Sequence, residues 1–116
     1  MASRKEINVR GHKITAAEFN EKMDGIPLFF IHGITASVNF WEPRQVPIVK
    51  EKCHWYALSL PGHYPAALPA IFEKENLTAD AIGKVLMEAI KELAGDQPVI
   101  LAGHSTGGFA ALYMAA

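Results

Sequence analysis

The order of apolar and polar residues along the chain predicts a hairpin and three further strands. Residues 5–19 alternate between polar and apolar side chains on either side of Gly11, which is typical of an antiparallel hairpin. Continuous apolar runs are instead typical of parallel strands that are buried on both faces of a sheet. Three such runs follow the hairpin, at about residues 27–32, 54–60 and 98–104.

Helical periodicity is clearest over residues 78–94. Apolar side chains recur there every three or four positions, with charged residues on the opposite face. Thr78 is expected to cap the start of this helix, and Gly95 is expected to end it. Residues 106–116 are apolar on every side, as expected of a helix buried against a sheet, and a short helix is expected at about residues 44–51.

The alternation of strands and helices after the hairpin predicts an α/β fold. We expect a three-layer sandwich in which helices cover a mostly parallel sheet that opens with the antiparallel hairpin. The chain has 116 residues, of which 50% are hydrophobic and 20% charged, so residues 1–116 are expected to form one domain around one core. Ligands of such sheets bind at the carboxyl ends of the strands, where His32, His63 and Ser105 are expected to lie.

The turn between the last strand and the last helix carries a serine flanked by glycines. Residues 103–107 read G-x-S-x-G, with Ser105 at the centre. A strand-to-helix turn this tight places the serine in a strained backbone conformation, and Gly103 and Gly107 avoid the collision that side chains would cause there. The hydroxyl then stands beside the amino terminus of a helix, which suits an oxyanion formed when Ser105 attacks a carbonyl group.

The bulk properties of the chain exclude several classes of partner. A net charge of -1 with scattered basic residues offers no surface for nucleic acid. No apolar run approaches the ~18 residues that a membrane-spanning helix needs. His12 and His54 do not cluster with other ligands, so no metal site is expected. Cys53 is the only cysteine and the first residues are polar, so we expect a cytoplasmic protein.

Four features, taken in order, resemble the α/β-hydrolase family over essentially the whole chain. They are the hairpin, a strand that ends in His32-Gly33, the loop at residues 60–63 (Leu-Pro-Gly-His) and the G-x-S-x-G turn. The resemblance implies a serine hydrolase that needs no cofactor and acts on carboxylic esters or related small apolar acyl substrates through an acyl-serine intermediate. It implies Ser105 as the nucleophile and the backbone amides of Ile34 and Thr106 as the oxyanion hole. Residues expected to support the turn and the neighbouring loop are His32, Gly33, Gly103, His104 and Gly107.

The acid and the histidine of the family's catalytic triad have no counterpart in this sequence. In the family both follow later strands, whereas this chain ends at Ala116 in the segment after the turn. We therefore expect the truncated, amino-terminal half of a hydrolase fold, which is inactive or weakly active alone. An alternative base is His63, with Glu73 or Glu75 from the same long loop as the orienting acid.

A second hypothesis is a non-catalytic module that binds a partner or oligomerises. Half of a hydrolase sheet would leave the strand at 98–104 without a neighbour on one side. We therefore expect either self-association or a missing carboxyl-terminal half to cover that edge. A third interpretation keeps the family but changes the reaction, as in acyl transfer or thioester hydrolysis.

Overall fold

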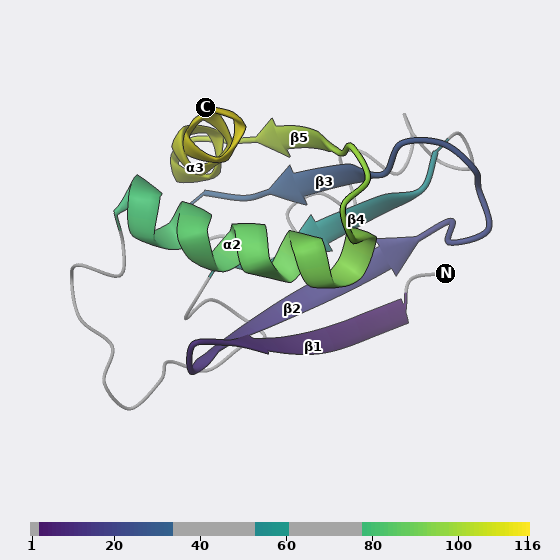
Figure 1. Ribbon diagram of the computed structural model, residues 1–116, viewed down its shortest axis with the longest axis horizontal. Helices are drawn as coiled ribbons and strands as arrows, with labels where there is room; N and C mark the ends of the chain where they lie inside the picture. The colour runs from purple at the N-terminus through teal and green to yellow at the C-terminus, as the bar shows by residue number, and fades with distance from the viewer. Residues whose placement is uncertain (1–2, 34–52, 61–77) are drawn as a thin grey trace.

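The computed structural model describes residues 3–33, 53–60 and 78–116, which form one twisted sheet with two helices (Figure 1). The strands lie side by side in the order β1-β2-β4-β3-β5, so β1 and β5 form the two edges. The strands are β1 (Ser3–Val9), β2 (His12–Phe19), β3 (Leu28–Ile31), β4 (Trp55–Leu58) and β5 (Ile100–Gly103), and the helices are α2 (Ala79–Ala94) and α3 (Thr106–Ala115).

A two-residue turn closes the hairpin of β1 and β2. Arg10 and Gly11 occupy this turn with φ angles of 52° and 82°. Positive φ at both central positions produces the turn whose twist matches that of two paired strands. The resulting register places Val9 opposite His12. β2 then pairs antiparallel with β4, which attaches the hairpin to the rest of the sheet.

Strand β3 lies between β4 and β5 and is parallel to both. Phe30 is opposite Ala57 on one side and Ala102 on the other. Successive residues of a strand face opposite sides of a sheet, so Phe29 and Ile31 pack into one core cluster and Phe30 into another. Burial on both faces explains why this apolar run is continuous. With two antiparallel and two parallel pairings, the described sheet is mixed: the antiparallel hairpin is followed by parallel strands, as the sequence predicts.

Helix α2 begins and ends at the residues that the sequence predicts. The Thr78 hydroxyl oxygen accepts a hydrogen bond from the Ala81 amide at 3.3 Å. At the other end, Gly95 adopts a φ of 69° and donates its N–H to the Lys91 carbonyl at 2.8 Å. One face of the helix packs onto the sheet through buried apolar side chains: Ile82, Val85, Leu86, Ala89 and Ile90.

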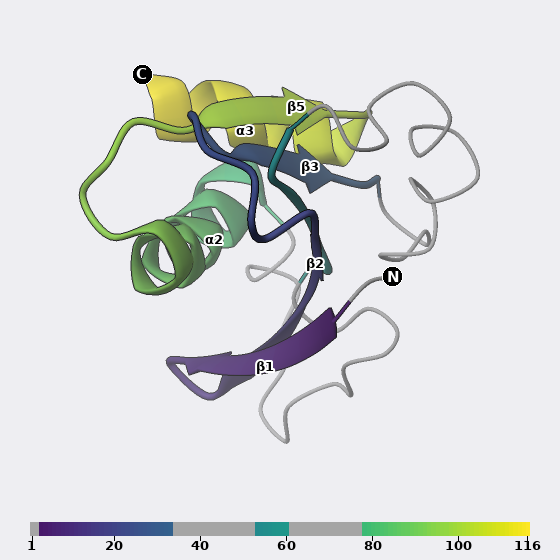
Figure 2. The ribbon, with the colours of Figure 1, turned by 90° about the vertical axis from the view of Figure 1, so that its right-hand side faces the viewer.

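Helices α2 and α3 pack against each other on the same face of the sheet. α2 contacts β1 and β2, whereas α3 contacts β5 and β3. Figure 2 shows α3 running back alongside β5. The helix expected at residues 44–51 lies outside the described residues, so the described part of the sandwich has its helices on one face. Neither described helix is long and apolar enough to cross a membrane.

Candidate active site

Ser105 lies in the turn that joins β5 to α3, at the carboxyl end of the strand. Its backbone has a φ of 56° and a ψ of -121°, a conformation that costs a non-glycine residue about 1–3 kcal/mol and persists only where the surroundings enforce it. Although Ser105 precedes a helix, its side chain makes no capping hydrogen bond. The residue is exposed, so its hydroxyl is left for other contacts.

Two glycines make the tight turn around Ser105 sterically allowed. A Cβ atom on Gly107 would collide with the carbonyl oxygens of Ile31 and His32, the latter at 2.5 Å. A Cβ atom on Gly103 would collide with the carbonyl group of Gly107. Because these neighbours are backbone atoms, no side-chain rotation relieves the clash. The strand and the helix therefore approach this closely only with glycine at both positions.

The end of β3 lies directly beside this turn. The His104 amide donates a hydrogen bond to the Ile31 carbonyl at 3.0 Å, which holds the turn on β3. A Cβ atom on Gly33 would lie 3.2 Å from the Cβ of Ser105 and 3.7 Å from Nδ1 of His104. The structure thus brings Gly33 next to Ser105, with the exposed His104 ring beside both.

His32 is fully buried at the end of β3, and backbone groups occupy both of its ring nitrogens. Nδ1 lies 2.7 Å from the Gly33 carbonyl oxygen, and Nε2 lies 3.0 Å from the Leu60 amide nitrogen. A carbonyl can only accept a hydrogen bond and an amide N–H can only donate one, so Nδ1 carries the proton and Nε2 is the acceptor. A ring held in this way is not available as the base that deprotonates Ser105.

The amino terminus of α3 contributes partial positive charge next to Ser105. Thr106 is the first residue of the helix, and the amides of a first turn have no acceptor within the helix. The helix dipole adds positive potential at the same end. The other amide that the family resemblance implies, that of Ile34, lies outside the described residues, and so does His63.

Asp24 and Asp96 lie at the amino ends of parallel strands, too far from Ser105 to act on it. Asp24 precedes β3 and Asp96 precedes β5, whereas Ser105 follows β5. Parallel strands keep their carboxyl ends at one edge, so the length of a strand separates these carboxylates from the serine. Within the three described ranges, no three His, Cys, Asp or Glu side chains lie close enough together to hold a metal ion.

An apolar groove of about 830 Å³ extends from Ser105 along β5 and α3. Among the described residues that line it, none is charged. Phe109 and Leu112 of α3 are 66% and 70% exposed, and Ile100 of β5 is 52% exposed. A helix that is apolar on all sides is typical of a buried environment, so this exposure is unusual for a folded surface.

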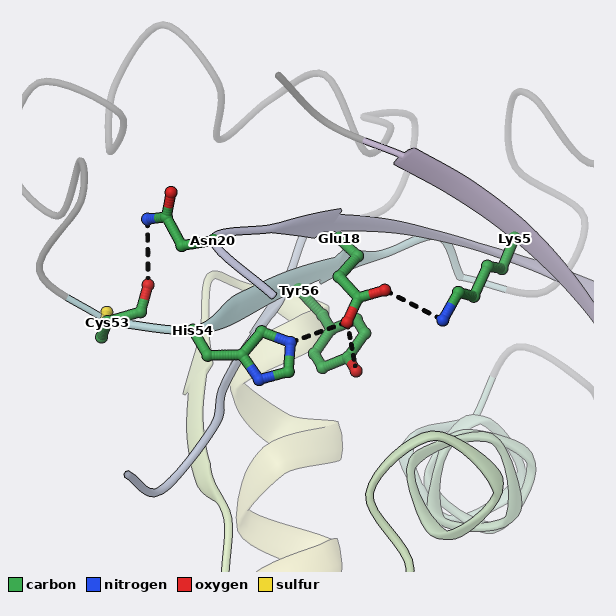
Figure 3. Close-up of polar contacts among 6 residues, drawn as sticks. All are labelled: Lys5, Glu18, Asn20, Cys53, His54 and Tyr56. Atoms are coloured by element: carbon green, nitrogen blue, oxygen red, sulfur yellow. Dashed lines mark hydrogen bonds and ion pairs between the residues drawn. The ribbon is translucent and has the colours of Figure 1, made fainter. Parts of the chain in front are cut away.

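A polar cluster lies near the start of β4 (Figure 3). Ser105 follows the carboxyl end of β5, and β3, β4 and β5 are parallel, so the cluster lies at the other end of these strands. Glu18, only 5% exposed, accepts a hydrogen bond from the Tyr56 hydroxyl at 2.9 Å. Its other contacts are His54 Nε2 at 2.7 Å and the Lys5 ammonium at 2.9 Å. Little in the sequence indicates this site, because a glutamate in an alternating strand normally faces solvent.

The contacts of Glu18 decide its ionisation. Burial raises the pKa of Glu18, but the hydrogen bonds from Lys5, His54 and Tyr56 outweigh this, and the net pKa lies below the ordinary value of a glutamate. Burial and the neighbouring carboxylate raise the pKa of Tyr56, which therefore stays protonated as a hydrogen-bond donor. The cluster joins three strands by charge-assisted hydrogen bonds and has no contact with Ser105 that would draw it into chemistry there.

The fold is similar to that of several solved hydrolases. The Cif epoxide hydrolase of Acinetobacter nosocomialis matches with a TM-score of 0.80 at 28% sequence identity, over 97% of this chain and 33% of that one. The N-acyl homoserine lactonase AidH, complexed with N-hexanoyl homoserine, matches with a TM-score of 0.84 at 23% identity, over 98% of this chain and 40% of that one. The second likeness concerns the fold alone.

In sequence, the chain is similar to protein phosphatase methylesterase 1. It is 29% identical to the mouse (Mus musculus) protein over 114 residues and 27% identical to the bovine (Bos taurus) protein over 113 residues. These matches cover 96% and 95% of the chain but only 29% of each relative. The chain therefore spans less than a third of the length of these curated relatives.

A sequence model of the Alpha/beta hydrolase family matches residues 28–116, from the first residue of β3 to the end of the chain. The matched range includes the three parallel strands β3, β4 and β5, the two described helices and the turn that holds Ser105. On the strength of this match and of the shared fold, the chain belongs to the alpha/beta hydrolase family.

Proposed function

We propose that Ser105 is the nucleophile of a serine hydrolase that acts on carboxylic esters or related acyl compounds. The observation that carries this proposal is the strained backbone of Ser105, held at a strand end with its hydroxyl unused by the helix. The serine oxygen bonds to the acyl carbon as a base takes its proton. The alcohol then leaves with that proton, and water hydrolyses the acyl-serine in a second step.

Two backbone amides, those of Thr106 and Ile34, are proposed to hold the negative charge on the carbonyl oxygen. The Thr106 amide directly follows Ser105 at the positive end of α3. Gly33 packs against Ser105, so the peptide group after Gly33 starts next to the serine. Loss of one such donor typically lowers kcat by about 10²–10³. In this proposal Gly103, Gly107, His32 and His104 support the site without touching the substrate.

The acid and the histidine of a catalytic triad are proposed to come from outside these 116 residues. The chain spans 29% of the mouse methylesterase and 33% of the Cif epoxide hydrolase. A serine without a general base is a poor nucleophile, so the 116-residue chain alone is expected to be inactive or weakly active. His63, with Glu73 or Glu75, remains an alternative base, and all three residues lie outside the described ranges.

The substrate is proposed to be a small apolar acyl compound. The name of the methylesterase relatives indicates that they act on a methyl ester, and the walls of the groove beside Ser105 are mainly apolar. Acyl transfer and thioester hydrolysis use the same nucleophile and differ only in the acceptor or the leaving group. The proposed reaction needs no cofactor, and a cytoplasmic location stays a prediction.

The apolar face formed by β5 and α3 is proposed to be covered by the remainder of a hydrolase fold. The opposite edge of the sheet, β1, carries exposed Arg4, Lys5 and Glu6, and charged residues of this kind protect an edge strand from pairing. β5 has no charged residue. Without a cover, the same face is expected to drive self-association. In the alternative, non-catalytic module, this face would be the binding surface itself.

Labelling with a fluorescent fluorophosphonate probe tests the proposed nucleophile. We expect weak labelling of the chain alone and stronger labelling when imidazole is added as a diffusible base. Ser105→Ala should abolish the labelling, whereas Ser3→Ala, which removes an exposed serine of β1, should not. If a chain shown to be folded by circular dichroism labels no better than Ser105→Ala with or without imidazole, the non-catalytic module is the better interpretation.

A further inference from the structure

The segment between β2 and β3 contains the dipeptide Asp24-Gly25. No other aspartate or asparagine of the chain is followed by glycine. Residues 21–26 are all exposed and lie outside the helices and strands. Gly25 has a φ of 114°, and a Cβ atom on it would meet nothing within 4 Å. The dipeptide therefore stands open to solvent, in a backbone conformation that favours glycine.

Backbone hydrogen bonds hold the chain on either side of this dipeptide but not at it. The Met23 amide donates to a carbonyl three residues earlier at 3.0 Å, and the Leu28 amide donates to the His54 carbonyl at 3.0 Å. Within the described ranges, no residue forms a hydrogen bond or an ion pair with Asp24 or Gly25. The Asp24 carboxyl group and the amide nitrogen that follows it are therefore able to approach each other.

We propose that Asp24 is a site of isoaspartate formation in the folded chain. The Gly25 nitrogen bonds to the side-chain carboxyl carbon of Asp24, and the carboxyl hydroxyl leaves with the amide proton as water, which closes a succinimide ring. A second water then opens the ring. Attack at the side-chain carbonyl restores aspartate, whereas attack at the backbone carbonyl leaves a peptide bond that runs through the side chain and a branching α-carboxylate. Glycine favours ring closure because it has no Cβ to shield its nitrogen.

The other two aspartates of the chain lack this combination of features. Asp80 lies in the first turn of α2, where the next amide donates to the Thr78 hydroxyl at 3.3 Å. Asp96 is 92% exposed, but its carboxylate lies 3.7 Å from the Lys91 ammonium, and the side chain of Gln97 crowds the nitrogen that would attack. Asp96 is therefore a matched control within the same molecule: it is an exposed aspartate without a following glycine.

The proposed modification lies far from the candidate nucleophile. Asp24 precedes β3, whereas Ser105 follows the carboxyl end of the parallel strand β5. The change adds one methylene group to the backbone just before β3, in a segment with open space around Gly25. The fold is therefore expected to survive the change, and the inference stands or falls independently of the proposed function.

Incubation of the folded chain at neutral pH and body temperature, followed by tryptic digestion, tests the proposal. Electron-transfer fragmentation of the peptide that begins at Met23 distinguishes isoaspartate from aspartate. We expect isoaspartate to accumulate at residue 24, at a rate comparable to that in a synthetic peptide of residues 20–28, and not at Asp96. Asp24→Glu keeps the charge and should abolish the product, because glutamate would have to close a larger ring. Circular dichroism establishes that the chain stays folded throughout.

Three results would overturn the proposal. Conversion in the synthetic peptide but not in the folded chain would mean that the fold protects Asp24. Equal conversion of Asp24 and Asp96 would mean that neither the glycine nor the open segment selects the site. In heavy-oxygen water, the label should enter residue 24 as the ring opens, so isoaspartate without the label would contradict the succinimide route.

Discussion

The backbone of Ser105 is strained in a way that a pair of substitutions can measure. Glycine adopts a φ of 56° without steric cost, whereas alanine does not. Ser105→Gly is therefore expected to be more stable than Ser105→Ala by about 1 kcal/mol, after allowance for the greater freedom of glycine in the unfolded chain. Urea unfolding of the two variants checks this difference. Equal free energies of unfolding would mean that the turn relaxes and stores no strain.

The two glycines that follow Ser105 are expected to respond oppositely to alanine. A Cβ atom on Gly107 meets backbone carbonyls of β3, so Gly107→Ala should lower the free energy of unfolding by about 3 kcal/mol. At Gly108 the nearest backbone atom would be 3.5 Å away, an ordinary contact. Gly108→Ala should therefore be neutral or stabilise by up to about 1 kcal/mol through helix propensity. Thermal unfolding of both variants tests the contrast, and similar losses at the two positions would contradict it.

At the scale of elements, the packing of α2 on α3 depends on Gly83. A Cβ atom there would lie 2.5 Å from Cδ2 of Tyr113 on α3. Gly83→Ala is expected to destabilise the wild type by about 1 kcal/mol through overpacking. In a Tyr113→Ala background the same change should stabilise by about 1 kcal/mol, because only the helix propensity of alanine remains. Urea unfolding of all four chains gives the coupling, and an effect of the same sign in both backgrounds would contradict the contact.

The Glu18 cluster is expected to make the attachment of the hairpin sensitive to acid. The folded pKa of Glu18 lies below its ordinary value, so the unfolded chain binds the proton more tightly. Its stabilising contribution is complete above the unfolded pKa of about 4.3 and is lost as the pH falls through the lower folded pKa. Glu18→Gln should therefore cost about 3 kcal/mol at pH 7 and progressively less below about pH 4.

Urea unfolding of Glu18→Gln at several pH values checks this expectation. Glu6→Gln is the matched control, because Glu6 is an exposed glutamate on the same hairpin, and it should change the stability little at any pH. A stability difference between Glu18→Gln and the wild type that does not vary with pH would mean that the ionisation of Glu18 is not what the cluster stabilises.

The sequence predicts the individual strands, helices and turns better than it predicts which of them lie next to one another in the fold. Local sequence patterns predict the capping of α2 by Thr78, the hairpin turn at Gly11 and the strand-to-helix turn at Ser105, because each feature depends on residues close together in the chain. The α/β-hydrolase fold itself, expected from the order of these motifs, is confirmed by the family match and the solved structures. The order of strands in the sheet places β4 between β2 and β3. The contacts of Glu18 with Tyr56 and of His32 with Leu60 result from this order. They join residues far apart in the chain, so no local sequence pattern predicts them.

At the scale of the whole molecule, the two edges of the described sheet differ in polarity. The β1 edge is charged, whereas β5 and α3 present an apolar face with Phe109 and Leu112 largely exposed. A 116-residue chain with this face in contact with water is expected to self-associate, with a sedimentation coefficient that rises with concentration.

Leu112→Lys and Phe109→Lys place a charge on that face and should shift the chain toward monomer. The control is Met23→Lys, which charges an exposed methionine in the segment between β2 and β3 and should leave the association unchanged. If the unmodified chain stays monomeric at every concentration, its apolar face tolerates water. The proposal that the rest of a hydrolase fold must cover β5 and α3 would then lose its physical basis.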